Sequence, residues 1–102
     1  MSQTPTVFLA APTNTVDGQI VTLSITVFNS ANSPLNATVT LQITGPNNYL
    51  LFDVVQVKVN ANSAATAYYD WAVPSKAGTY TVIAGFLPPS VGGADLEIVQ
   101  VS

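Results

Sequence analysis

Few side chains in this sequence can take part in acid–base or nucleophilic chemistry. The 102 residues include five carboxylates and two lysines, and neither histidine nor cysteine nor arginine occurs. These absences exclude a Ser-His or Cys-His nucleophile pair and the usual cysteine or histidine zinc site. No side chain has an ordinary pKa near neutrality, where general acid–base catalysis operates best. We therefore expect no catalytic residue, no cofactor, no metal site and no enzyme activity.

Asp95 and Glu97 are an acidic pair two residues apart, a spacing that places both on one face of a strand. They could contribute to a Ca²⁺ site with Asp17 or loop carbonyls. However, Ca²⁺ takes about six to eight oxygen ligands, and the sequence has no Asp-x-Asp-x-Asp-Gly loop. A glycosidase pair would need a cleft and one carboxyl with a raised pKa. We favour a solvated edge for this pair.

Tyr68 and Asp70 have the residue types of a sugar site. An exposed tyrosine ring can stack on a sugar while the neighbouring carboxylate accepts hydrogen bonds from its hydroxyls, and Tyr49 and Phe52 could join them. The alternative is ordinary pairing between side chains of adjacent strands. Both interpretations place Tyr68 and Asp70 on a solvent-facing surface.

Asn36-Ala37-Thr38 matches the acceptor pattern for N-glycosylation. It is expected where a loop meets a strand, within reach of a modifying enzyme. The pattern matters only if the protein is exported, so Asn36 is a possible glycosylation site.

The charge balance excludes other classes of partner. With a net charge of −3 and two lysines, the chain offers no basic surface for nucleic acid. Residues 18–52 and 77–94 carry no charge, but polar residues and prolines interrupt them, and no apolar run approaches the ~18–20 residues of a membrane span. The first residues have neither the charged nor the apolar part of a signal peptide.

Alternating apolar and polar residues predict strands throughout the chain. In residues 19–29, for example, Val21, Leu23, Ile25 and Val27 share one face. Doubled apolar pairs at residues 50–51 and 54–55 predict a bulge or a bend near Asp53. Turn residues separate seven expected strands, which cover residues 6–10, 19–29, 37–44, 49–59, 65–71, 79–86 and 95–101.

This spacing predicts an all-β, Ig-like Greek-key β-sandwich of about seven antiparallel strands. Residues 1–102 form one domain, and residues 1–5 are expected to be a flexible or added N-terminus. Charged residues make up only 7% of the chain, against ~25% in an average globular protein, which favours a domain of a larger extracellular protein.

The last strand is expected to present apolar residues on both faces. Leu96 and Ile98 are predicted to face the core, so Val99 and Val101 would be exposed. Exposed apolar residues on an edge strand invite pairing with another chain or domain. Val99 and Val101 are therefore candidate interface residues, and a homo-oligomer formed by edge-strand contact is one possibility. Phe28 also departs from the polar pattern of an outward face.

Several segments together have a familiar pattern. They are Gly18-Gln19-x-Val21-x-Leu23-x-Ile25-x-Val27-x-Asn29, Val39-x-Leu41-x-Ile43-x-Gly45, Val57-x-Val59-x-Ala61, the segment Ala65 to Trp71, and Ala77-Gly78-Thr79-Tyr80-x-Val82.

This pattern resembles the Ig-like and fibronectin-type-III-like modules of prokaryotic cell-surface proteins, and most closely the CARDB type (cell-adhesion-related domain of bacteria and archaea). The resemblance covers roughly residues 16–87 and carries no catalytic site. It implies a tyrosine corner at Tyr80, in which the hydroxyl bonds back to the preceding loop.

Three functions are compatible with these observations. The first is a non-catalytic structural, adhesion or spacer module of a larger extracellular or S-layer-like surface protein. Its partners would be neighbouring domains or other surface subunits. The second is a carbohydrate-binding accessory module of a secreted enzyme, with glycans as partners. The third is a subunit or anchor of a surface filament. None of them involves nucleic acid or membrane insertion.

Overall fold

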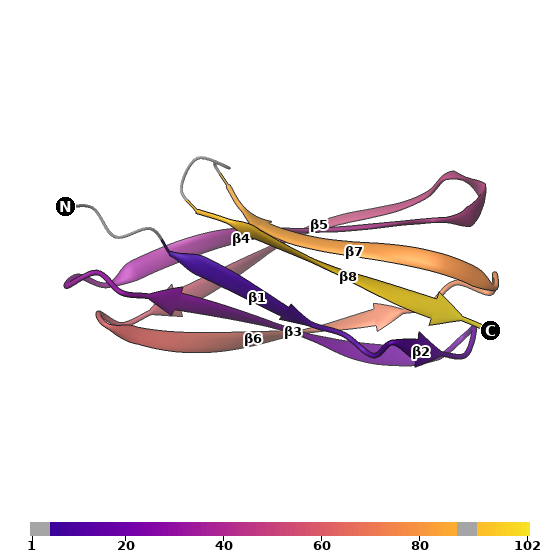
Figure 1. The fold of residues 1–102 in the computed structure, drawn as a ribbon, viewed down its shortest axis with the longest axis horizontal. Helices are drawn as coiled ribbons and strands as arrows, with labels where there is room; N and C mark the ends of the chain where they lie inside the picture. The colour runs from indigo at the N-terminus through magenta and orange to yellow at the C-terminus, as the bar shows by residue number, and fades with distance from the viewer. Residues whose placement is uncertain (1–4, 88–91) are drawn as a thin grey trace.

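The computed structural model describes residues 5–87 and 92–102, which fold into two packed β-sheets (Figure 1). The elements are β1 Thr6–Ala10, β2 Asn14–Thr15, β3 Ile20–Asn29, β4 Leu35–Gly45, η1 Pro46–Asn48, β5 Tyr49–Val59, β6 Ser63–Ala72, β7 Gly78–Phe86 and β8 Ala94–Val101.

One sheet has the strand order β1-β3-β6 and the other β2-β8-β7-β4-β5. All pairings are antiparallel except that between β2 and β8. The prediction of an all-β sandwich is confirmed, and each of the seven expected strands is present. The described residues contain an eighth strand, β2, whose two residues are too short to show any alternation.

Strict alternation buries one side of each long strand. In β3, Leu23, Ile25 and Val27 are inaccessible to solvent, and in β7 Tyr80 and Val82 are equally inaccessible. Residues between them face outward, which is the pattern of a sheet with one covered face. The core therefore lies between the two sheets.

Tyr80 is the centre of an aromatic cluster at one end of this core. Its ring makes edge-on contacts with Tyr49 and Trp71, at centroid distances of 5.5 and 5.6 Å. The indole Nε1 of Trp71 donates to the Tyr49 hydroxyl at 3.2 Å. The Tyr80 hydroxyl donates to the carbonyl oxygen of Lys76 at 2.7 Å, in the loop before β7. The predicted tyrosine corner is confirmed.

Gly45, the last residue of β4, lies against this cluster. A Cβ atom at this position would overlap Cδ2 and Cε2 of the Tyr80 ring. The next residues form η1 and turn the chain into β5, with Asn47 and Asn48 at positive φ. Asparagine tolerates this conformation better than most residues, which suits it to the turn.

We expect Tyr80→Phe to lower the free energy of unfolding by about 1–2 kcal/mol, because it leaves a carbonyl without its donor. Urea unfolding would measure the change. Tyr68→Phe removes an exposed hydroxyl that bonds to none of the residues the structure describes, and it should leave the midpoint unchanged. Equal midpoints for Tyr80→Phe and the unmodified protein would contradict the role given to the corner.

The Tyr80 hydroxyl also makes the free energy of unfolding depend on pH in the alkaline range. Burial, with a smaller contribution from nearby Tyr49, raises the pKa of Tyr80 above its ordinary value of 10.0. The folded state therefore keeps a proton that the unfolded state loses. This stabilisation is complete below about pH 10 and is lost as the pH rises through the folded-state pKa. The urea midpoint should fall between pH 9 and pH 11, and fall less in Tyr80→Phe.

Of the bulge or bend predicted near Asp53, the bulge is wrong. The β4–β5 register runs without interruption from Leu35 opposite Val59 to Gly45 opposite Tyr49. The doubled apolar pairs arise because the outer face of β5 is itself apolar, with Leu50 and Val54 exposed. Asp53 lies at the rim of the sandwich, where its Oδ2 accepts a hydrogen bond from the Tyr69 hydroxyl at 2.9 Å. It thus links β5 to β6 of the other sheet.

The predicted orientation of the last strand is also wrong. Val99 and Val101 are buried, whereas Leu96 and Ile98 are 49% and 42% exposed. The reason is the register: Val99 lies opposite the buried Tyr80 and Val101 opposite Gly78. Val99 and Val101 therefore belong to the core and cannot serve as an exposed apolar interface.

The ends of β2 and β8 are joined by a short ladder of backbone hydrogen bonds. Gln100 N donates to Thr13 O at 2.9 Å, Ser102 N to Thr15 O at 3.0 Å and Asp17 N to Ser102 O at 3.0 Å. The two strands run parallel (Figure 1). This ladder covers the C-terminal part of the β8 edge.

The body is elongated, with extents of 46 × 20 × 17 Å. Within residues 5–87 and 92–102, no helix is long and apolar enough to cross a membrane. Of the N-terminal residues 1–5 expected to be flexible or added, residues 1–4 lie outside the described part of the chain, and Pro5 is buried.

Candidate binding surface

The outer face of the three-stranded sheet carries three exposed aromatic rings, one from each strand. Phe8 of β1 is 54% exposed, Phe28 of β3 49% and Tyr68 of β6 71%. Phe8, Phe28 and Tyr68 are together called the aromatic face below. An outward sheet face is normally polar, so three large rings on so small a sheet call for an explanation.

Hydroxyl-bearing side chains separate these rings. The Thr26 and Thr66 hydroxyls hydrogen-bond to each other at 2.8 Å, directly beside Phe8 in the register. Thr22 donates to Oδ1 of Asp70 at 2.9 Å, one row beyond Tyr68. These cross-strand bonds fix the side chains, so the face alternates between apolar rings and polar groups held in place.

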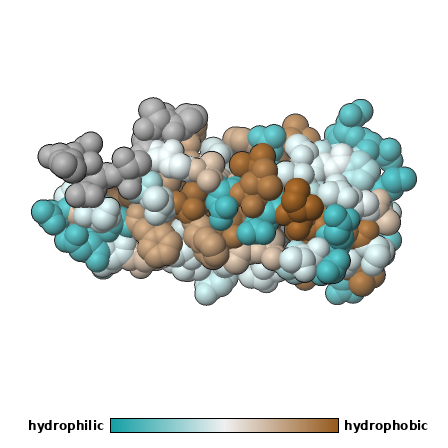
Figure 2. All heavy atoms as spheres, in the orientation of Figure 1, coloured by the Kyte–Doolittle hydropathy of each residue, from teal (hydrophilic) through white to brown (hydrophobic). Residues whose placement is uncertain are grey.

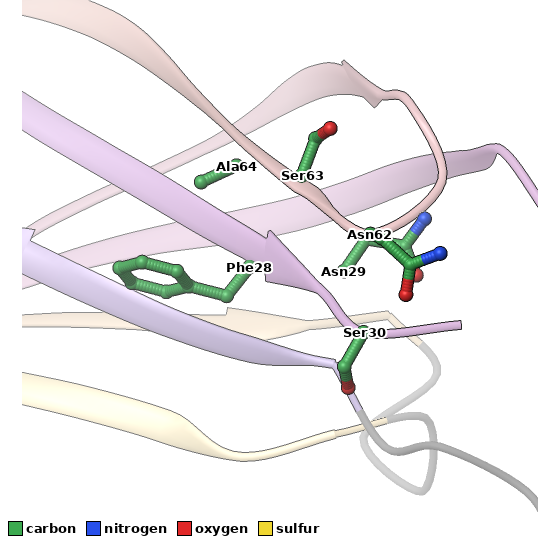
Figure 3. A pocket seen from close by; sticks show the side chains of 6 residues that line it. All are labelled: Phe28, Asn29, Ser30, Asn62, Ser63 and Ala64. Atoms are coloured by element: carbon green, nitrogen blue, oxygen red, sulfur yellow. The ribbon is translucent and has the colours of Figure 1, made fainter. Parts of the chain in front are cut away.

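An open hollow of about 400 Å³ lies next to Phe28 (Figure 3). The Phe28 ring borders it on one side, and the Asn62 amide lies toward the loop end of the hollow. Its lining residues are Phe28, Asn29, Ser30, Asn62, Ser63 and Ala64.

Asn29 holds the two loops that form this hollow. Its amide Nδ2 donates to the carbonyl oxygens of Ser33 at 2.9 Å and Asn60 at 3.1 Å, and its Oδ1 accepts from Ala31 N at 3.1 Å. The side chain is buried, so these bonds satisfy its polar atoms. These three bonds hold the loops that form the wall of the hollow in place.

The structure brings together some of the residues predicted for a sugar site and separates others. Tyr68 and Asp70 share the outer face of β6, as predicted. Tyr49 is half-buried beneath Trp71, and Phe52 lies on the outer face of the other sheet, so neither joins them. The sequence analysis missed Phe8 as a member, although its position between buried Val7 and Leu9 already placed it outward.

Asp95, one of the acidic pair of β8, accepts hydrogen bonds from backbone N–H groups through both of its carboxylate oxygens. Asp95 Oδ2 accepts a hydrogen bond from the backbone N of Leu9 in β1 at 2.9 Å, which ties β8 to the other sheet. Oδ1 of the same carboxylate accepts from Leu96 N at 2.9 Å. Across the described residues, no group of three or more His, Cys, Asp or Glu side chains could hold a metal ion.

Asn36 is exposed near the start of β4, opposite Lys58 on β5. Two residues on, the Thr38 hydroxyl donates to Oε1 of Gln56 at 3.1 Å. The side chain of Asn36 is accessible from solvent, and its glycosylation stays a prediction.

The outer face of the five-stranded sheet forms a second apolar surface. The exposed apolar side chains of β5 and β8 lie along its two sides, and they are Leu50, Phe52, Val54, Leu96 and Ile98. The space-filling view shows apolar side chains gathered over the middle of the body, with hydrophilic residues predominating at both ends (Figure 2).

The fold and these surfaces define a two-sheet β-sandwich with exposed apolar side chains on both outer faces. No protein-family model matches the sequence, and no curated protein matches it either. Several solved structures have a fold similar to that of this chain.

The CARDB domain of PF1109 from Pyrococcus furiosus, in its solution structure, is 17% identical. The alignment covers 95% of this chain and 93% of that one, with a TM-score of 0.76. A crystal structure of the same domain in complex with di-metal ions gives 16% identity, a TM-score of 0.75, and coverage of 96% and 87%. The resemblance to the CARDB type is therefore confirmed for the fold.

A β-glucosidase from Listeria innocua contains a similar sandwich. The TM-score is 0.73 at 12% identity, and the match covers 93% of this chain but only 16% of the glucosidase. The same fold thus occurs in that protein as a small part of a much longer chain.

Proposed function

We propose that this chain is a non-catalytic structural module of a larger extracellular or cell-surface protein. It holds neighbouring domains apart or presents them for adhesion, and its partners are those domains or other surface subunits. The observation that carries this proposal is the CARDB-like sandwich itself, which extends over 95% of the chain.

Two further features support the proposal. The body is more than twice as long as it is wide, which suits a spacer. Charged residues are 7% of the sequence, far below the ~25% of an average globular protein. A surface with few charges and many threonine and asparagine side chains is compatible with an exterior environment.

The hypothesis of a filament assembled through β8 rested on exposed Val99 and Val101. Both side chains lie in the core, so they do not support it. Part of the β8 edge is also occupied by β2. The carbohydrate-binding alternative keeps its support, since Tyr68 and Asp70 are exposed on one face.

The intact mass of the native protein from its source tests the structural role. We expect a mass far above 10.6 kDa, since the module would be one part of a longer chain. Additional sugar-sized increments that disappear in an Asn36→Gln variant would establish glycosylation and export. A native mass near 10.6 kDa without additions would refute the spacer role.

A further inference from the structure

We propose that the aromatic face binds a neutral polysaccharide chain. Phe8, Phe28 and Tyr68 would stack on sugar rings along the chain, while the hydroxyls of Thr26 and Thr66 would bond the sugar hydroxyls between them. Asp70, one row beyond Tyr68, would bond hydroxyls at that end. This function is additional to the structural role and does not depend on it.

The distribution of polar and apolar groups supports a saccharide. A sugar ring has apolar C–H faces and a rim of hydroxyls, so it is amphipathic on the scale of a few ångströms. The aromatic face has the same alternation, because the Thr26–Thr66 and Thr22–Asp70 pairs lie between and beside the rings. A protein partner would favour a contiguous apolar centre with a polar rim.

The absence of cations on this face selects a neutral ligand. The two lysines lie elsewhere, Lys58 on β5 of the other sheet and Lys76 in the loop before β7. A nucleic-acid strand also stacks on aromatic rings, but it requires a positively charged groove for its phosphates. Asp70 adds a negative charge, which would repel a uronic acid or sulfated polymer.

The spread of the rings selects a chain rather than a single sugar. The register and the usual strand geometry place the backbone of Phe8 about 8 Å from that of Phe28 and about 12 Å from that of Tyr68. Phe28 and Tyr68 are about 14 Å apart by the same geometry. One sugar ring cannot contact all three, whereas an extended chain lying across the three strands can. The open hollow beside Phe28 gives the chain room at one end.

Affinity electrophoresis in native gels tests this proposal with hydroxyethylcellulose, mannan and xylan as probes. We expect at least one polymer to retard the unmodified protein. Tyr68→Ala and Phe8→Ala should each weaken binding about tenfold, in line with the contribution of one aromatic contact and its buried area. Retardation should persist in about 0.5 M NaCl, because a neutral ligand is not held by screened charges.

Phe52→Ala is the matched control, since Phe52 is 59% exposed on the opposite sheet. It should be retarded as strongly as the unmodified protein, and the urea midpoints of all variants should confirm folding. The proposal is overturned if no polymer retards the protein, if Phe52→Ala loses binding equally, or if salt abolishes binding. Sedimentation that shows a dimer dissolved by Tyr68→Ala would also overturn it, because a second copy would then cover the face. None of these results changes the native mass, so the structural role is judged separately.

Discussion

Trp71→Ala should lower the free energy of unfolding by about 3–5 kcal/mol. Trp71 is the single tryptophan of the chain and is inaccessible to solvent, so the substitution opens a large cavity between the sheets. It also removes the edge-on contact with Tyr80 and leaves the half-buried Tyr49 hydroxyl without its donor. A domain of this size has about 5–15 kcal/mol of total stability, so much of it would be lost.

Urea unfolding followed by circular dichroism measures this effect, since the variant has no tryptophan fluorescence. Tyr68→Ala is the control: it removes an aromatic ring that is 71% exposed, on the same strand, and should cost less than about 1 kcal/mol. Similar losses for the two variants would show that Trp71 does not organise the core.

Gly45→Ala should destabilise the fold by about 2–3 kcal/mol through overpacking. The φ angle of Gly45 is −165°, which any residue adopts, so the effect is steric alone. The added methyl group would overlap the Tyr80 ring. That ring cannot easily yield, because Trp71 and Tyr49 pack against it and its hydroxyl is bound to Lys76 O.

Gly93→Ala isolates this steric effect, because a Cβ at Gly93 would have no neighbour within 4 Å among residues 5–87 and 92–102. Its urea midpoint should match that of the unmodified protein, while that of Gly45→Ala falls. If both variants unfold at the same urea concentration, the contact between Gly45 and Tyr80 is not tight.

The strands that could be predicted correctly are those with polar residues on one face. In β3 and β7 the alternation has one interpretation, and the buried residues are those expected. In β5 and β8 apolar residues occupy both faces, so the sequence is compatible with either orientation. Contacts between residues distant in sequence decide the orientation of such a strand. In β8, Asp95 accepts a hydrogen bond from Leu9 N, 86 residues away, and Val99 lies opposite Tyr80 of the adjacent strand β7.

The candidate surface was predictable only in part for a related reason. Tyr68 and Asp70 alternate with half-buried Tyr69 and buried Trp71 on one strand, so their shared face follows from local periodicity. Phe8 and Phe28 join them through the registers of two pairings, which a single sequence does not reveal. The hollow beside Phe28 depends on the loops that Asn29 holds together, and this is a tertiary arrangement.

The ladder between β2 and β8 has a mechanical consequence. The chain enters β2 from the β1 side and leaves the fold at the end of β8, and the two strands run parallel (Figure 1). A tensile force applied to the two ends of the chain would slide one strand along the other rather than peel them apart. The bonds from Gln100 N, Ser102 N and Asp17 N would then bear the load together instead of breaking one at a time. β1 lies between the N-terminus and β2 and pairs with β3, so the same force would also load that pairing. A module pulled from its two ends would resist extension through both pairings.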